Sequence, residues 1–156
     1  MGLPPNSESA PSSKSSSDST GQPVSLRSIR FLTLFPELIE PSLKASLLGK
    51  ASSRKLMQFG VTQIRDFATN KHRTVDETPY GGGEGMLLRV DVLHSAWKSI
   101  VHESPMRRRR TLLLSPQGRH LTQAKAQELL GFDELILVCG HYEGVDARVP
   151  EILKAK

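Results

Sequence analysis

Two short apolar runs, at residues 112–114 and 135–139, constrain the fold of this chain more than any other feature. Neither run alternates with polar residues, which is typical of strands covered on both faces of a parallel sheet. Between the runs, Thr122 is a suitable N-cap for a helix that continues to Leu130, and Gly131 suits the end of that helix. The helix residues expected to face the sheet are Ala124, Ala126, Leu129 and Leu130. The segment therefore predicts a strand, a helix and a second, parallel strand.

The two loops that follow these strands are expected to lie side by side. Parallel strands joined by a helix form a right-handed crossover, so their carboxyl ends meet at one edge of the sheet. The first loop reads Ser-Pro-Gln-Gly-Arg at residues 115–119, and the second reads Gly-His-Tyr-Glu-Gly at residues 140–144. Ligands of open α/β sheets bind at this edge. We therefore expect a ligand pocket between the two loops.

The preceding part of the chain continues the alternation of strands and helices. Residues 30–34 and 61–64 read as short strands, and a helix between them begins after Phe35 and closes at Gly49. A further helix begins at Asp91. Apolar residues expected to face the core are Leu38, Ile39, Leu43, Leu47 and Leu48 in the first helix, and Leu93, Trp97 and Ile100 in the second. The predicted fold class is α/β, with a mostly parallel sheet flanked by helices.

The first 26 residues differ in composition from the rest of the chain. Serine dominates them, with scattered proline and glycine and almost no large apolar residue. Such a segment buries too little surface to offset the entropy of ordering, so residues 1–26 are expected to be a disordered tail and residues 27–156 the folded domain. A transit peptide to an organelle is an alternative, although Glu8 and Asp18 and the absence of arginine before Arg27 favour an inert extension.

Charge points to an anionic partner without identifying it. The formal net charge is +5, and because the three charged residues of the tail sum to −1, residues 27–156 carry +6. A compact basic domain suggests RNA, although the same charge also supports solubility. Four arginines at residues 107–110 either attract phosphate or form a solvated face. A single cysteine, Cys139, excludes an internal disulfide and suggests no metal cluster, and no run is long enough to span a membrane.

A glycine-rich loop occupies residues 70–86. Four glycines fall within positions 81–85, at a cost in backbone entropy that a surface linker need not incur. They suit close approach of the backbone to a ligand or a partner chain, or they form a flexible linker. Lys71, His72 and Arg73 nearby either contact phosphates or are solvated. A P-loop is disfavoured, because no Lys-Ser/Thr pair follows the glycines.

Six motifs in fitting order resemble one family. They are FLTLFP at residues 31–36, IRDF at 64–67, KHRTVD at 71–76, PYGGG at 79–83, LSPQGR at 114–119 and CGHYEGVD at 139–146. Together they resemble the bacterial tRNA (guanine-N1)-methyltransferases of the knotted SPOUT class, over about residues 29–149. The resemblance implies transfer of a methyl group from S-adenosylmethionine to the guanine 3′ of the anticodon. It also implies a homodimer whose active sites use both chains.

The resemblance also assigns site residues. The adenosylmethionine site would be lined by Leu114, Ser115, Pro116, Gly140, Tyr142 and Glu143. Contacts to the tRNA substrate would come from Asp66, Arg73, Gly81, Gly82 and Gly83. Asp66 and Glu143 would support the chemistry, because guanine N1 bears a proton that a carboxylate must remove. Asp146 is a third acid near the inferred cleft, and Arg65, Arg73 and Arg119 are the cations that could stabilise charge on the base oxygen.

The family pattern ends after Val149, and residues 150–156 do not match it. Relatives continue with a Gly-rich loop that completes the donor site and the knot, and then with a helical domain that binds tRNA. The resemblance also places the presumed general base beyond Lys156, so Asp66 and Glu143 are assigned only supporting roles. We therefore expect a truncated methyltransferase with little or no activity of its own.

The alternative is a non-catalytic RNA-binding or dimer-partner module. Its support is the basic domain and the run of four arginines. The expected location is the cytoplasm, or an organelle if the serine-rich tail is a transit peptide.

Overall fold

The computed structural model describes residues 25–79, 82, 85–141 and 144–155. The expected disordered tail therefore lies outside the described residues, except for Ser25 and Leu26. These two belong to the folded domain. The Ser25 amide donates to the Leu130 carbonyl at 3.0 Å, and Leu26 is buried against Leu129 and Leu135. The assignment of Ser25 and Leu26 to the predicted tail is thus wrong.

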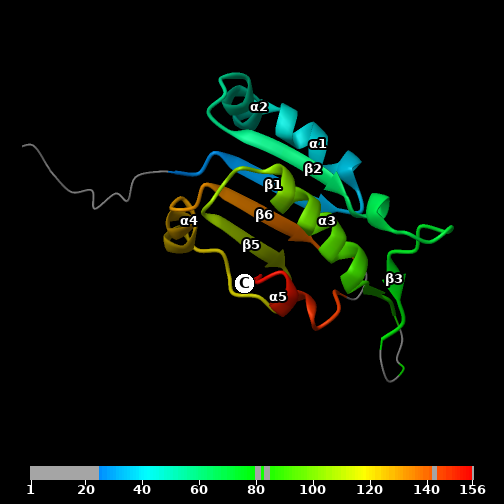
Figure 1. The fold of residues 1–156 in the computed structure, drawn as a ribbon. Coiled ribbons are helices and arrows are strands. Elements are labelled where there is room, and N and C mark those ends of the chain that lie inside the picture. Colours follow the sequence, from blue (N-terminus) through cyan, green and yellow to red (C-terminus); the bar gives the residue numbers. More distant parts are fainter. Residues whose placement is uncertain (1–24, 80–81, 83–84, 142–143, 156) are drawn as a thin grey trace, which may run out of the picture.

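Four parallel strands form the central sheet (Figure 1). They are β1 (Ser28–Thr33), β2 (Gln58–Gln63), β5 (Arg109–Leu114) and β6 (Glu134–Cys139), in the spatial order β2-β1-β6-β5. The predicted parallel pairing of the last two strands is confirmed. Because every strand runs in the same direction, all four carboxyl ends meet at one edge and all four amino ends meet at the other.

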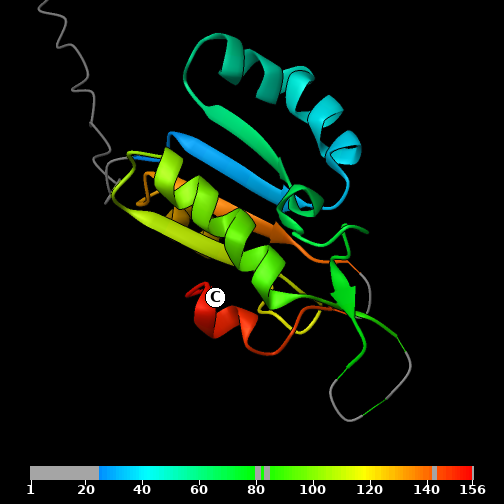
Figure 2. The same cartoon turned by 45° about the vertical axis from the view of Figure 1, so that its right-hand side comes forward.

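Helices cover the two faces of this sheet. On one face, α3 (Val90–Glu103) and α5 (Val149–Ile152) share a core with Ile136 and Val138 of β6. On the other face, α4 (Gln123–Leu129) packs on Leu135 of β6, because successive strand residues point to opposite sides. Figure 2 shows α3 lying along the sheet and α5 below it. Among the described residues, no helix is long and apolar enough to cross a bilayer.

Two helix predictions are confirmed in position. The Thr122 hydroxyl accepts a hydrogen bond from the Lys125 amide at 3.2 Å and so caps α4 as expected. Leu129 of α4 is buried, but Ala124 is exposed and does not face the sheet. In α3, Trp97 packs against the core, and its indole N–H donates to the Thr111 hydroxyl at 3.0 Å.

The single helix predicted between the first two strands is instead two helices, α1 (Pro36–Lys44) and α2 (Ser46–Ser53). Ala45 between them is extended, with φ −97° and ψ 157°. Gly49 lies inside α2 rather than at a helix end. Glycine is required there because a Cβ would be 2.3 Å from the Lys44 carbonyl oxygen. The leucines expected in the core are largely exposed, Leu47 by 75%.

A small antiparallel ribbon forms between the predicted glycine-rich loop and the residues that follow it. Its strands are β3 (Asp76–Glu77) and β4 (Leu87–Leu88). Leu88 also bridges to Val145 in the loop after β6, with the Leu88 amide donating to the Gly144 carbonyl at 3.1 Å and the Asp146 amide donating to the Leu88 carbonyl at 3.3 Å. The ribbon therefore ties the glycine-rich segment to the loop that follows β6.

Candidate functional site

The two loops predicted to form a pocket begin next to each other. Leu114, the last residue of β5, is paired with Cys139, the last residue of β6, so Ser115 and Gly140 follow adjacent strand ends. The predicted adjacency is confirmed at this point. Tyr142 and Glu143, both predicted to line the donor site, lie outside the described residues.

The loop after β5 forms a tight turn. The Ser115 carbonyl accepts from the Gly118 amide at 3.0 Å, and its hydroxyl accepts from the Gln117 amide at 3.2 Å. A Cβ on Gly118 would approach the Ser115 carbonyl oxygen to 3.1 Å, which explains the glycine. Leu114 is 53% exposed, and Ser115 and Pro116 are exposed beside it. The turn thus presents one apolar side chain and a hydroxyl at the carboxyl edge of the sheet.

The loop after β6 is exposed to solvent at its first residues, Gly140 and His141. Gly140 is exposed, and a Cβ there would meet the Val145 side chain at an ordinary 3.6 Å. Packing within the described chain therefore does not require glycine at this position. The next residue, His141, makes an edge-to-face ring contact with Phe35, at 4.8 Å between centroids. Phe35 follows β1, so three neighbouring strands contribute to this part of the edge. No pattern in the sequence indicated that ring contact.

Asp66 and Arg73 form an ion pair after β2. The Arg73 guanidinium lies 3.2 Å from the Asp66 carboxylate, and both side chains are 58% exposed. The Arg65 guanidinium donates to the Arg73 carbonyl at 3.2 Å, so the structure brings three predicted site residues together. Asp66 belongs to the 3-10 turn η1 (Ile64–Phe67), which Ile64 anchors in the core.

The glycines predicted to contact substrate are described in part. Gly82 adopts a left-handed φ of +81°, and nothing would lie within 4 Å of a Cβ there. Backbone conformation rather than close packing therefore favours glycine at this position. Gly81 and Gly83 lie outside the described residues. Arg119 is exposed in the loop after β5.

Asp146, predicted as a third acid near the cleft, is bound by Arg148 in the loop after β6. It is buried, and its carboxylate accepts hydrogen bonds from the Arg148 amide at 2.9 Å and from the Arg148 guanidinium Nε at 2.8 Å. These bonds with Arg148 lower the pKa of Asp146 to about 2. The Asp146 carboxylate thereby stabilises the turn that leads into α5.

Most of the four arginines at residues 107–110 contact other residues of the chain. Arg109 Nε lies 2.5 Å from the carboxylate of fully buried Glu134, and Arg108 pairs with Asp133 at 3.1 Å. The Arg110 guanidinium stacks over the Phe132 ring at 5.3 Å. Three of the four are therefore engaged by the protein itself, which favours a structural role for the run.

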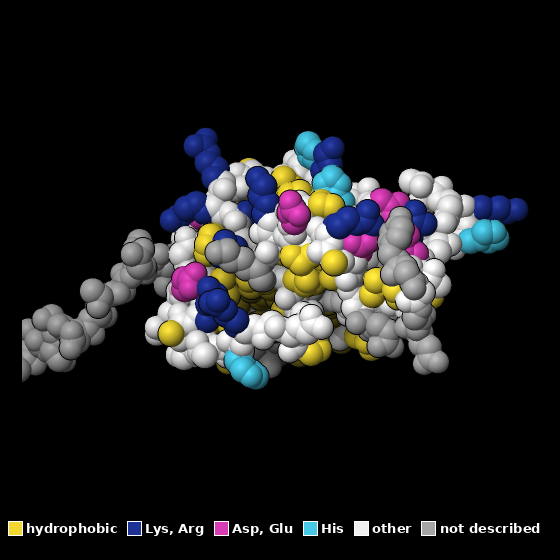
Figure 3. All heavy atoms as spheres, turned by 90° about the horizontal axis from the view of Figure 1, so that it is seen from below, with side chains coloured by type: hydrophobic (Ala, Val, Ile, Leu, Met, Phe, Trp, Pro, Cys, Tyr) yellow, Lys and Arg dark blue, Asp and Glu magenta, His cyan; other side chains and the backbone are white. Residues whose placement is uncertain are grey.

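The surface is also hollowed away from the predicted loops, which the sequence did not indicate. An open pocket of about 540 Å³ lies beside the amino ends of β1 and β2, at the opposite edge of the sheet. Figure 3, which views the molecule from below relative to Figure 1, shows hydrophobic side chains exposed around a second hollow. The large apolar residues exposed on the described chain include Leu114 and Leu121.

The chain matches known proteins over most of its length. The family described as tRNA (Guanine-1)-methyltransferase TrmD matches residues 27–155. A tRNA (guanine-N(1)-)-methyltransferase of Rhizobium etli is 51% identical over 122 residues, which are 78% of this chain and 51% of that protein. The protein of the same name in Enterococcus faecalis is 43% identical over 121 residues, with 78% and 49% covered.

A solved structure agrees with the fold. The crystal structure of tRNA (m1G37) methyltransferase from Aquifex aeolicus is similar with a TM-score of 0.72 and 29% sequence identity, over 81% of this chain and 56% of that one. The chain spans about half the length of the curated relatives it matches.

The family match extends further along the chain than the six sequence motifs indicated. It reaches residue 155, so the expectation that the family pattern ends after Val149 is wrong. In this part of the chain, Val149 of α5 and the following Leu153 are buried in the same core as α3, so the fold continues past Val149. Lys156 lies outside both the matched range and the described residues, so the general base expected beyond Lys156 stays a prediction. The chain belongs to the tRNA (guanine-1)-methyltransferase TrmD family.

Proposed function

We propose that this chain forms the methyl-donor side of a tRNA (guanine-N1)-methyltransferase site, with S-adenosylmethionine as donor. The observation that carries the proposal is the pairing of Leu114 with Cys139, because it starts both predicted donor loops at the carboxyl edge of a parallel sheet. The names of the relatives supply the reaction class.

The described residues fit an adenosyl ligand. Leu114 offers exposed apolar surface, Ser115 offers a hydroxyl, and Gly140 leaves the edge free of a side chain. Such a mixture of apolar surface with a few polar groups is typical of small-molecule sites. When bound, the donor supplies an activated methyl group, so the protein mainly has to align it with the base. We propose Pro116, Tyr142 and Glu143 as the further donor contacts.

On the substrate side, we propose that Asp66 and Arg73 contact the target guanine, together with the glycines at residues 81–83. Asp66 is already paired with Arg73, so accepting the proton of guanine N1 would require this ion pair to open. Glu143 is the second proposed acid. Because both side chains of the Asp66–Arg73 pair are 58% exposed, opening it costs no more than about 1 kcal/mol and leaves Asp66 able to act. The alternative function is a non-catalytic RNA-binding or dimer-partner module, whose support is the net charge of +6 on residues 27–156.

We also propose a homodimer in the cytoplasm. Its support is the exposed apolar surface on α1, on α2 and after α2, which would be costly to leave in water. The residues concerned are Leu38, Leu47, Leu48 and Leu56.

Donor binding is tested by calorimetric titration of the 156-residue chain with S-adenosylmethionine. We expect saturable binding that the variant Gly140→Leu weakens by about tenfold or more, which corresponds to about 1.4 kcal/mol. The matched control Ala124→Leu adds the same side chain at an exposed helix position and should bind as the wild type does. Failure of the wild type to bind, or an equal loss in both variants, would refute the donor site. Transfer of labelled methyl to a tRNA transcript then separates the enzyme from the binding module.

A further inference from the structure

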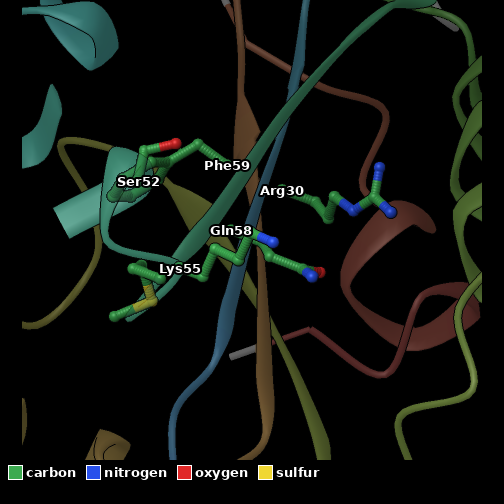
Figure 4. A pocket seen from close by; sticks show the side chains of 6 residues that line it. Arg30, Ser52, Lys55, Gln58 and Phe59 are labelled. Carbon is green, nitrogen blue, oxygen red and sulfur yellow. The ribbon is translucent and has the colours of Figure 1, made fainter.

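The open pocket at the amino ends of β1 and β2 is rich in hydrogen-bond donors. Residues from the first two strands and from the end of α2 surround it (Figure 4). The lining residues are Arg30, Ser52, Lys55, Met57, Gln58 and Phe59. In Figure 4, Arg30 extends to one side of β2 while Ser52 and Phe59 stand on the other. The pocket therefore combines two cations and two polar side chains with an aromatic and a thioether wall.

Lys55 adopts an unusual backbone conformation at this pocket. Its φ is +57°, in the left-handed region that glycine normally occupies after a helix. The Lys55 amide donates to the Ser52 carbonyl at 2.9 Å, and the Leu56 amide donates to the Ala51 carbonyl at 3.0 Å. This is the Schellman pattern that ends many helices. Lysine at this position carries a backbone strain that glycine would avoid, and strain of this kind is found at binding sites.

The sequence around Lys55 contains basic residues and no acid. Between Glu40 and Asp66 the sequence contains five cations and no acid. Within the described part of the chain, no carboxylate pairs with the exposed side chains of Lys50, Arg54 and Lys55. These charges thus remain available to an anion, unlike those of Arg108 and Arg109.

Arg30 adds a cation that the fold holds in place. It lies opposite Gly60 in the sheet register, and a Cβ on Gly60 would be 2.6 Å from the Arg30 guanidinium nitrogen Nη1. The missing side chain lets the Arg30 arm cross β2 toward the edge of the sheet. Arg30 Nε is 3.7 Å from the buried Glu134 carboxylate, whose charge Arg109 already balances at 2.5 Å.

Two simpler explanations account for only part of this arrangement. Cations near a helix C-terminus are stabilised by the helix dipole, and charged residues protect an edge strand such as β2 from pairing with another chain. Either effect would explain Lys50 or Arg54. Neither requires a strained lysine at a glycine position, or a glycine in a strand so that an arginine can pass.

We propose that Arg30, Lys55 and Gln58, here named the β2-edge site, bind the phosphate backbone of RNA. The proposal rests on the proposed function only in taking RNA as the polyanion. The strands are six residues long, and the donor loops follow strands two and three places away from β2, so the site is roughly 20 Å from these loops at the other edge of the sheet. An RNA chain seated at the donor loops spans that distance within a few nucleotides. Phe59 offers a surface on which a base can stack.

The test measures binding of a fluorescent tRNA transcript to the 156-residue chain by anisotropy at several salt concentrations, without S-adenosylmethionine. We expect Lys55→Gly to lower the slope of log affinity against log salt by about 0.7 to 0.9, which weakens binding roughly fivefold near 0.15 M salt. The same substitution should raise the urea midpoint, because it relieves the left-handed strain. A loss of binding therefore cannot come from unfolding. Lys125→Gln, in an exposed pair on α4, is the matched control for charge and should leave binding within twofold.

A second variant, Gly60→Ala, tests the position of the Arg30 guanidinium without deleting its charge. The new methyl group displaces the guanidinium, so we expect RNA binding to fall several-fold in a folded protein. Equal losses of RNA affinity in Lys55→Gly and Lys125→Gln, or no loss in either variant, would overturn the β2-edge site. Lys55-dependent binding to phosphatidylserine vesicles, with RNA binding unchanged by Lys55→Gly, would overturn it in favour of a lipid surface. Calorimetry with S-adenosylmethionine separately tests the donor site, which Lys55→Gly should leave intact.

Discussion

Replacing Glu134 is the most direct test of what holds the amino edge of the sheet. Its side chain is only 1% exposed and receives Arg109 Nε at 2.5 Å, with the hydroxyls of Ser28 at 3.1 Å and Ser104 at 3.0 Å and Arg30 Nε at 3.7 Å as further partners. Glu134→Ala leaves the mostly buried Arg109 charge without its counterion. Breaking a buried pair in this way costs about 3–5 kcal/mol. For a domain of this size, that lowers the melting temperature by roughly 10–20 °C.

Urea unfolding followed by circular dichroism measures this loss. The double variant Glu134→Leu with Arg109→Met is the informative comparison, because removing both charges together avoids the unpaired ion and should restore much of the stability. A loss below about 1 kcal/mol for Glu134→Ala would refute the reasoning, since exposed pairs have values of that size. An equal loss in the double variant would show that packing, rather than the charge, is responsible.

Three further variants test local parts of the fold. Gly49→Ala should destabilise by about 1–3 kcal/mol in urea unfolding, although alanine favours helices, because its Cβ would meet a backbone carbonyl that cannot move aside; a gain in stability would contradict the close approach. Trp97→Phe should lower the free energy of unfolding by about 1–2 kcal/mol, because the hydrogen bond to Thr111 is lost. A double-mutant cycle with Thr111→Val should give a coupling energy of about 0.5–1.5 kcal/mol, and a coupling energy of zero would contradict the hydrogen bond. The pKa of Asp146 falls to about 2 in the folded chain, so its carboxylate contributes to the free energy of unfolding at pH values above its usual pKa. This contribution is lost as pH falls toward 2. The deficit of Asp146→Asn should therefore be about 1–2 kcal/mol at pH 6 and shrink at pH 2.5, and a deficit independent of pH would contradict this assignment.

The parallel sheet and the adjacency of its loops could be predicted because both follow from local patterns. An unbroken apolar run marks a buried strand, and a helix between two such runs forces a parallel crossover whose ends meet. The register pair Leu114 and Cys139 is the direct result. The tight turn at residues 115–118 likewise follows from its proline and glycine.

Features that depend on contacts distant in the sequence could not be predicted in this way. Strands β3 and β4 have two residues each, too few to show any period, and the bridge from Leu88 to Val145 joins segments 57 positions apart. The arginine run did not indicate its partner, because Arg109 meets Glu134 only through the register of β5 with β6. The break at Ala45 was missed because the leucine spacing continues across it.

The pairing of charges, more than their number, determines which surface of this domain can bind a polyanion. Arg108 and Arg109 stand in the most basic run of the sequence, yet each is held by a carboxylate of β6 or the residue before it. Lys55 stands in a less conspicuous segment, but it faces solvent and has no acidic neighbour within the described residues. A phosphate can replace water around Lys55 without first separating an ion pair, whereas at Arg109 it would have to compete with a buried carboxylate. The net charge of +6 on residues 27–156 is therefore expected to act mainly through the β2 edge.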